Sequence, residues 1–234
     1  MKTTSIVATL LLFVVTGSAH AENIQVIDDF SQGGYHSPAY QGPNQTVTVS
    51  QTGDPRFLVG GNRSESLYLC TSPQTCASFN PFSQFSSYAI GPYNGANQLV
   101  QSTGYLEGLR LEVGYGYGAF MSAPLGAFKR IRVRFSGLTE VLNFNILAFT
   151  GNRYGQNACN VLPHAGPFVV EFPFDGFTQP GGPIDFNNLN HLDFIFQSGS
   201  AVGGVSFGVS KIEVSDTPLA GAIQCNFAQA IAGS

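Results

Sequence analysis

The sequence is poor in charge and has no tryptophan. Only 10% of its 234 residues are Asp, Glu, Lys or Arg, and the formal net charge is −4. Globular proteins usually carry about 25% charged residues. Because the chain lacks an excess of basic residues, binding to nucleic acid is not expected. Because tryptophan is absent, the chain lacks the largest flat ring that a protein can offer to a sugar.

Long apolar runs are also absent, apart from residues 6–15. That run is too short for a transmembrane helix, which needs about 20 apolar residues. It follows Lys2 and precedes Ala19 and Ala21, an arrangement typical of a secretory signal peptide. The sequence therefore predicts a signal peptide over residues 1–21, and a secreted or periplasmic mature chain that has no membrane span.

Cysteines are few but even in number: Cys70, Cys76, Cys159 and Cys225. Disulfides are the usual state of such residues in an exported protein. Of the three ways to pair them, we favour Cys70–Cys76 as a local loop closure and Cys159–Cys225 as a tie for the C-terminal tail. A zinc site is not expected, because the Cys and His residues lack the spacing of zinc ligands.

Strand and turn formers dominate the rest of the chain, and apolar and polar residues alternate in several segments. Many short strands without intervening helices indicate a sandwich or barrel. In the last strand the alternation changes phase, which predicts a β-bulge near Ser210 and Lys211. Strands are expected over residues 24–28, 46–51, 56–60, 64–70, 86–90, 97–102, 106–115, 128–136, 140–149, 167–174, 190–197 and 204–215.

Five stretches occur in a suggestive order: VIDDF at 26–30, GGNRSESLYL at 60–69, VEFPFDGF at 170–177, IDFNNLNHLDFIF at 184–196 and FGVSKIEVS at 207–215. Together they resemble the galactose-binding-like jelly-roll domains, a group that includes many carbohydrate-binding modules, and similar exported bacterial proteins. The resemblance implies a single antiparallel jelly-roll β-sandwich whose last strand lies beside the first. It contains no active-site signature and says little about function.

We therefore predict an all-β chain with one sandwich domain over residues 22–216. Residues 217–234 place Leu219, Ile223, Phe227 and Ile231 four apart. This spacing predicts a short helical or irregular tail that packs on the domain.

Asp28 and Asp29 stand side by side near the start of the mature chain. Adjacent strand residues point to opposite faces, so the two cannot act as an acid/base pair on one substrate. One interpretation is that they cap a turn by accepting backbone hydrogen bonds. The alternative is a structural Ca²⁺ site with Glu213 or Asp216, if the first and last strands pair as the resemblance implies. No other cofactor is expected.

Two sets of residues are candidates for glycan binding. Tyr115 and Tyr117 alternate with glycines that would leave their rings open for stacking on sugars; the alternative is that these rings cover core or loop surface. The second set is Arg132 with Asn143 and Asn145, on one sheet face, where guanidinium and amide groups would bind an acidic polysaccharide.

The alternative for Arg132 is structural. Arg130, Arg132 and Arg134 alternate along one strand, where carboxylates on neighbouring strands would balance them through cross-strand pairs. The candidates are Glu112, Glu140 and Glu171.

No catalytic set is predicted. The G-x-S-x-G match at 204–208 lies inside a strand pattern rather than at a strand-to-helix turn. No spacing of carboxylates singles out a glycosidase pair. The sequence favours a secreted, non-catalytic protein that binds extracellular or cell-wall polysaccharide. The alternatives are a self-associating surface, biofilm or filament subunit, and a carboxylate-dependent glycan hydrolase or lyase.

Overall fold

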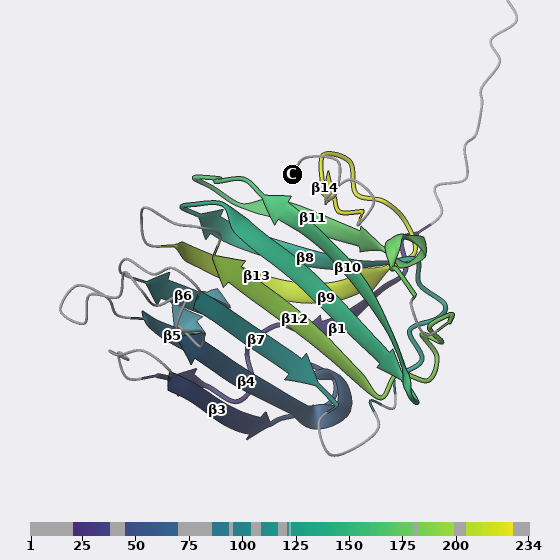
Figure 1. Ribbon diagram of the computed structural model, residues 1–234, viewed down its shortest axis with the longest axis horizontal. Helices are drawn as coiled ribbons and strands as arrows, with labels where there is room; N and C mark the ends of the chain where they lie inside the picture. Colours follow the sequence, from purple (N-terminus) through teal and green to yellow (C-terminus); the bar gives the residue numbers. More distant parts are fainter. Residues whose placement is uncertain are drawn as a thin grey trace, which may run out of the picture.

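The computed structural model describes residues 21–37, 45–69, 86–93, 96–103, 109–116, 121, 123–179, 182–198 and 205–226. Within these ranges the chain forms two packed β-sheets, an eight-stranded sheet A and a six-stranded sheet B. Sheet B crosses in front of sheet A in Figure 1. All strand pairs are antiparallel except β11 with β14. No helix among the described residues has the length and apolar character needed to cross a membrane.

Sheet A has the order β14-β11-β8-β13-β6-β5-β2, with β1 also paired to β13. Its strands are β1 (Ile24–Asp28), β2 (Tyr35–His36), β5 (Ser86–Tyr93), β6 (Ala96–Thr103), β8 (Arg130–Leu138), β11 (Phe168–Pro173), β13 (Ser206–Ser215) and β14 (Ile223–Gln224).

Sheet B has the order β10-β9-β12-β7-β4-β3. Its strands are β3 (Gln45–Thr52), β4 (Asn62–Leu69), β7 (Leu109–Tyr115), β9 (Leu142–Thr150), β10 (Arg153–Val161) and β12 (His191–Ser198). Two 3-10 turns complete the described elements, η1 (Val59–Gly61) and η2 (Phe174–Gly176). The two-sheet arrangement confirms the predicted jelly-roll β-sandwich.

Aromatic rings from both sheets fill the space between the layers. Phe144 of sheet B and Phe172 of sheet A meet edge to face, with ring centroids 4.9 Å apart. Phe196 of sheet B and Phe207 of sheet A are stacked, with ring centroids 4.9 Å apart. All four rings are buried, and each contributes roughly 1.5–3 kcal/mol through burial of apolar surface. The period-two pattern therefore predicts the core correctly.

The pairing of the first and last strands is confirmed. β1 runs antiparallel to β13, with Val26 opposite Glu213. The predicted bulge is confirmed as well, because the pairing of β13 with β8 shifts between Val209 and Lys211. The shift returns Ile212 and Val214 to the core side.

Two expectations about elements need correction. Residues 56–60 form a turn and part of η1 instead of a strand. β10, β2 and β14 were not predicted. The described part of the tail, residues 217–226, contains turns and β14, so the irregular form of the predicted tail is the one observed there.

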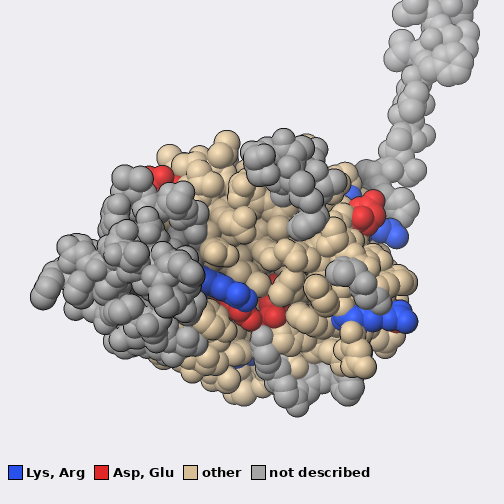
Figure 2. Space-filling view, in the orientation of Figure 1, with Lys and Arg blue, Asp and Glu red and all other residues tan. Residues whose placement is uncertain are grey.

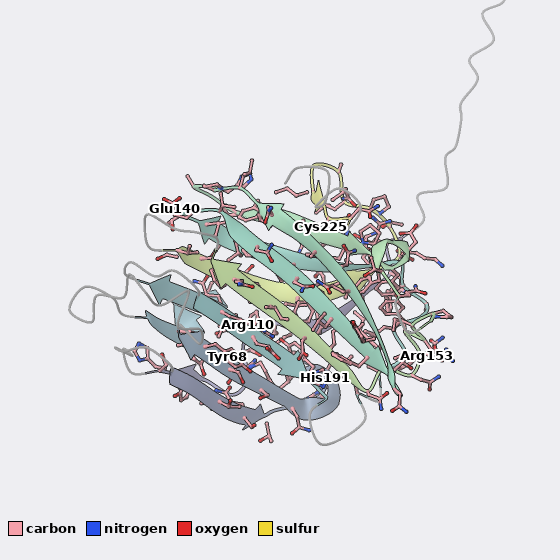
Figure 3. The ribbon with its side chains drawn as sticks, viewed as in Figure 1. Tyr68, Arg110, Glu140, Arg153, His191 and Cys225 are labelled. Atoms are coloured by element: carbon pink, nitrogen blue, oxygen red, sulfur yellow. A yellow bond between two sulfur atoms is a disulfide. The ribbon has the colours of Figure 1, made fainter. Side chains whose placement is uncertain are left out.

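The predicted disulfide between Cys159 and Cys225 is present. It joins the strand β10 to the end of the described tail, where Figure 3 labels Cys225. Cys70 and Cys76, Tyr117, residues 1–20 of the predicted signal peptide and residues 227–234 of the tail lie outside the described residues.

Candidate functional site

The outer face of sheet B carries a regular array of polar and aromatic side chains. Inward residues of each strand supply the core, so the alternating residues point outward. The strand register aligns these residues in rows across β10, β9, β12, β7 and β4. The first row is Asn160, Asn143, Gln197, Arg110 and Tyr68. The second is Ala158, Asn145, Ile195, Glu112 and Ser66. The third is Gln156, Leu147, Asp193, Gly114 and Ser64, and a fourth begins Tyr154, Phe149 and His191.

Arg110 occupies the middle of this face. Its Nη2 donates to Glu112 Oε2 at 2.6 Å, and its guanidinium carbon lies 5.2 Å from the centroid of the Tyr68 ring. Figure 3 places Arg110 and Tyr68 side by side on the face. In Figure 2 basic and acidic atoms meet at the centre of the same face, within a surface that is mostly uncharged. The ion pair and the ring together fix the plane of the guanidinium group.

Exposure differs sharply within the array. Asp193 is 3% exposed and Glu112 is 9% exposed, although both point outward. The side chain of Arg110 is 40% exposed, and Asn143 and Gln197 are also exposed. The two carboxylates and the buried Ile195 therefore form the floor of the face, while Arg110 and the amides stand around it.

Aromatic rings gather at the far end of the face. The Nε2 atom of His191 lies 2.6 Å from Asp193 Oδ2, and the His191 ring meets Phe149 edge to face at 4.8 Å. The centroids of the Phe149 and Tyr154 rings are 6.1 Å apart. Tyr154 is 43% exposed, so it presents a ring to solvent at one end of the array while Tyr68 lies toward the other.

The amide side chains of β9 lie on this same face. Asn143 Nδ2 donates to Asn160 Oδ1 at 3.1 Å, which holds both amides in place. The Asn145 Oδ1 atom is buried and accepts no hydrogen bond within the described part of the chain. The structure thus places both predicted asparagines in the array.

Arg132 does not join them, contrary to expectation. It belongs to β8 in sheet A, whereas β9 belongs to sheet B. Arg132 is buried and bonds to Glu171 at 2.8 Å, Glu22 at 2.8 Å and Glu213 at 3.3 Å. A guanidinium surrounded by three carboxylates has no free charge for an acidic polysaccharide. The alternative of cross-strand pairing with Glu171 is confirmed.

The expectation of an open ring at Tyr115 is also wrong. Tyr115 continues the inward alternation of Leu111 and Val113, and all three are fully buried. Its hydroxyl donates to Asp28 Oδ2 at 2.9 Å. Tyr115 is therefore a core residue, as the alternative interpretation held.

Asp28 belongs to a buried ionic cluster rather than to a functional site. Arg63 donates from Nη1 to Asp28 Oδ2 at 2.6 Å and from Nε to Glu65 Oε1 at 2.5 Å, and all three side chains are fully buried. Burial raises the pKa of Glu65 to about 7, even though Arg63 opposes the shift. One guanidinium thus serves two carboxylates inside the sandwich.

The capping interpretation of the aspartate pair is confirmed. Asp28 Oδ1 accepts from the Phe30 backbone amide at 2.7 Å, and Asp29 Oδ1 accepts from the Ser31 amide at 3.0 Å.

The Ca²⁺ alternative is not supported by the arrangement of its residues. Asp28 faces the core, whereas Glu213 faces the other side of sheet A and binds Arg134 at 2.6 Å. Asp216 accepts from the backbone amide of Asn23. Among the described residues, no three or more His, Cys, Asp or Glu side chains are placed to hold a metal ion together.

Sequence reasoning found only part of the array. Arg110 and Glu112 show the outward alternation, but nothing local indicates that β7 lies between β4 and β12. The neighbours Tyr68, Gln197 and Asp193 therefore could not be assembled from spacing. A partial signal exists in HLDF at 191–194, where His191 and Asp193 are two apart and so share a face.

No protein-family model matches the sequence, and the search of curated proteins found no match. Among solved structures, the family 11 carbohydrate-binding module of the cellulosomal cellulase Lic26A-Cel5E of Clostridium thermocellum is 12% identical, with 83% of this chain and 95% of that chain aligned at a TM-score of 0.40. The family 11 module from Clostridium thermocellum in complex with a β-1,3-1,4-mixed-linked tetrasaccharide is 14% identical. The alignment covers 88% of this chain and 99% of that chain, at a TM-score of 0.39.

An agarase, AgWH50C, is 9% identical, with 83% of this chain and 25% of that chain aligned at a TM-score of 0.39. Carbohydrate-binding modules, the group that the sequence resembles, are thus among the structural neighbours. Because all of these TM-scores are below 0.5, no ligand or function is inferred from them.

Proposed function

We propose that this chain is an exported, non-catalytic protein that binds a neutral polysaccharide along the outer face of sheet B. The observation that carries the proposal is the array itself: fixed amide, guanidinium and carboxylate groups between Tyr68 and Tyr154. Three row steps along the strands span about 20 Å. A surface of this length suits an extended chain ligand better than a single sugar.

The polar groups match the chemistry of sugar hydroxyls, each of which both donates and accepts a hydrogen bond. Arg110 offers donors, Glu112 and Asp193 offer acceptors, and Asn143 and Gln197 offer both. Their mutual contacts hold Arg110 and Asn143 in place before a ligand arrives. Such preorganisation lowers the entropy lost on binding.

The charge of the face favours a neutral ligand. Arg110 is the single Arg or Lys side chain in the rows of the array, whereas Glu112 and Asp193 place two carboxylates in its floor. A uronic acid placed over this floor would meet like charge, which disfavours binding.

Binding is favoured over hydrolysis by the contacts of the two carboxylates. A glycosidase needs one protonated carboxyl group to donate to the leaving oxygen. Here Glu112 is paired with Arg110 and Asp193 with His191. These partners suit carboxylates that accept hydrogen bonds from a ligand. Export is supported by the apolar leader and by the Cys159–Cys225 disulfide.

The test is a binding assay against a panel of soluble neutral and acidic polysaccharides, by affinity electrophoresis and calorimetry. Arg110→Ala is expected to lower the affinity for the best-binding neutral polysaccharide at least tenfold, since hydrogen bonds to charged groups are worth about 1.5–3 kcal/mol. Arg56→Ala is a matched control. Arg56 also pairs with a carboxylate, Asp54, and lies 5.6 Å from a ring, that of Phe57, but it is not part of the array.

A second pair of variants tests the aromatic end of the face. Tyr154→Ala should lower the affinity for the same polysaccharide, because it removes a ring that is 43% exposed. Phe57→Ala removes a ring that is 40% exposed elsewhere and should have no effect. The proposal is wrong if no neutral polysaccharide binds, or if both members of each pair behave alike.

A further inference from the structure

A cavity of about 960 Å³ lies on the outer face of sheet A, on the opposite side of the sandwich from the array. Pockets for small ligands usually measure about 300–1,000 Å³. Strands β6, β8 and β13 and the loop after β10 line it. Its polar side chains are Gln98, Ser136, Thr139, His164, Ser206 and Ser210.

Two glycines lie in the wall of the cavity, and Gly208 leaves room for the hydrogen bond between Ser136 and Gln98. Gly137 of β8 and Gly208 of β13 stand directly opposite one another, and the register shifts immediately after this pair. A Cβ atom at Gly208 would overlap the Ser136 hydroxyl and come within 2.9 Å of Gln98 Oε1. Glycine within a strand often marks a place where a ligand or another backbone approaches closely. Around this glycine pair, the space is bounded by the sheet and by the loop that carries His164.

The walls of the cavity are held rigidly. Ser136 Oγ donates to Gln98 Oε1 at 2.7 Å across Gly208. The Ser206 backbone amide donates to Thr139 Oγ1 at 2.8 Å. The loop is tied to the sheet by two backbone hydrogen bonds between Leu138 and His164, each 2.9 Å long. The polar atoms therefore keep fixed positions, as a binding site requires.

The chemistry of the lining selects the class of ligand. None of the described residues that line the cavity is Asp, Glu, Lys or Arg. Hydroxyl and amide groups alternate with apolar surface from Val100, Leu138 and Pro163. A charged ligand would lose its hydration without an ionic partner. The hydroxyls of Ser136, Thr139 and Ser210 already donate within the protein. They therefore meet a ligand as hydrogen-bond acceptors, and the ligand must supply the donors. A small, uncharged molecule with several hydroxyl groups satisfies both parts of the lining.

We infer that this cavity is a second binding site, for a neutral monosaccharide, disaccharide or glycan chain end. It shares no residue with the face on sheet B, so an experiment can disprove binding at one site without affecting the other. A protein that has both sites could hold a polysaccharide chain on one side and a sugar terminus on the other.

The experiment is a titration of isotope-labelled full-length mature protein, followed by amide chemical shifts. The probes are glucose, galactose, mannose, cellobiose and lactose, with glucuronate and cyclohexanol as charged and apolar comparisons. At millimolar concentrations at least one neutral sugar should shift the amides of Gly137, Thr139, Ser206 and Gly208. Glucuronate and cyclohexanol should shift them less.

Substitution at Gly137 tests whether the cavity itself binds. A Cβ there would have only the His164 carbonyl oxygen within 4 Å, at 3.7 Å, so a side chain can enter the cavity. Gly137→Leu should weaken sugar binding at least tenfold and Gly137→Ala less, while polysaccharide binding stays as in the wild type. Should Gly137→Leu not fold, the double variant Gln98→Leu, Ser206→Ala removes hydroxyl and amide groups without filling the space, and the same loss is expected.

Three results would overturn the inference. The first is that no neutral sugar shifts these amides. The second is that the Gly137→Leu protein, or the double variant, binds the sugar as tightly as the wild type. The third is that glucuronate or cyclohexanol binds more tightly than every neutral sugar. Loss of polysaccharide binding alone would count against the face on sheet B and not against this cavity.

Discussion

At the scale of single residues, the buried cluster around Arg63 explains the paired aspartates of the VIDDF stretch. Arg63 reaches Asp28, Glu65 and the backbone oxygen of Gln32, and Tyr115 donates to the same Asp28 oxygen. The cluster connects β1 of sheet A to β4 and β7 of sheet B. Removing one partner from such a cluster leaves an uncompensated charge in the interior, which is strongly destabilising.

Asp28→Asn should therefore be strongly destabilising. Removing one member of a buried ion pair costs about 3–5 kcal/mol. Asp29→Asn, at an adjacent residue whose carboxylate caps an exposed turn, should cost about 1 kcal/mol or less. Denaturant unfolding of the two variants measures the difference. Equal losses would show that Asp28 acts only as a cap.

At the same scale, two predicted ligand residues show where sequence reasoning stops. The alternation that makes Tyr115 a core residue is present in the sequence, but its flanking glycines suggested an exposed ring. For Arg132, alternation gave the correct side of its strand. It offered Glu171 only as one of three candidate partners, and it did not reveal that Glu22 would also bind the guanidinium. Partners far apart in sequence decide both cases.

At the scale of elements, strands with apolar alternation were predictable, whereas the edge strand β10 was not. β10 pairs only with β9, so it lies at the edge of sheet B. Its core-side residues include Gly155 and Asn157, which break the apolar alternation. Gly155 is required because a Cβ there would lie 2.8 Å from Ile184 Cγ1. In contrast, the apolar run Phe57–Val59 imitates a strand but forms a turn.

For the tail, the structure decides between the helical and irregular forms that the sequence allowed. Its four-residue spacing favours a helix, yet the Cys225 amide donates to the Glu171 carbonyl at 2.8 Å and β14 pairs with β11. The Thr217 carbonyl also accepts from Arg132 at 3.0 Å. Sheet contacts and the disulfide therefore override the helical periodicity.

Removing the disulfide should loosen this element. The double variant Cys159→Ala, Cys225→Ala opens a connection that spans 66 residues. Loss of such a cross-link typically costs about 2–4 kcal/mol. Denaturant unfolding measures the loss, and limited proteolysis should show earlier cleavage within residues 217–226. An unchanged unfolding free energy together with unchanged proteolysis would show that β14 holds the tail without the disulfide.

At the scale of the whole molecule, the stability of the sandwich should depend on pH through Glu65. Its folded pKa is raised from 4.5 to about 7. Between these values the folded protein keeps a proton that the unfolded chain has lost. The unfolding free energy should therefore fall as pH rises from about 4.5 to 7, by on the order of 3 kcal/mol, and then level off.

Glu65→Gln is the control for this prediction, because it keeps the shape of the side chain and removes the titration. Denaturant unfolding across the pH range should give a flatter profile for this variant than for the wild type. Identical profiles would show that Glu65 does not control this part of the pH dependence.

The two outer surfaces of the sandwich differ in character, and this difference is a property of the whole molecule. Sheet B presents the array of fixed polar groups, whereas much of sheet A carries arginine–glutamate pairs that are satisfied internally. The sequence predicted two layers and a filled core. It could not predict which outward side chains would lie together on one face, because that depends on the order of strands within each sheet.

The most direct test of the account is to map the amide shifts caused by a hexasaccharide of the best-binding neutral polysaccharide. The account predicts that the largest shifts lie on β7, β9 and β12, at Arg110, Asn143 and Gln197, and extend toward Tyr154. Shifts confined to other parts of the chain, or saturable binding that leaves these three strands unperturbed, would contradict it.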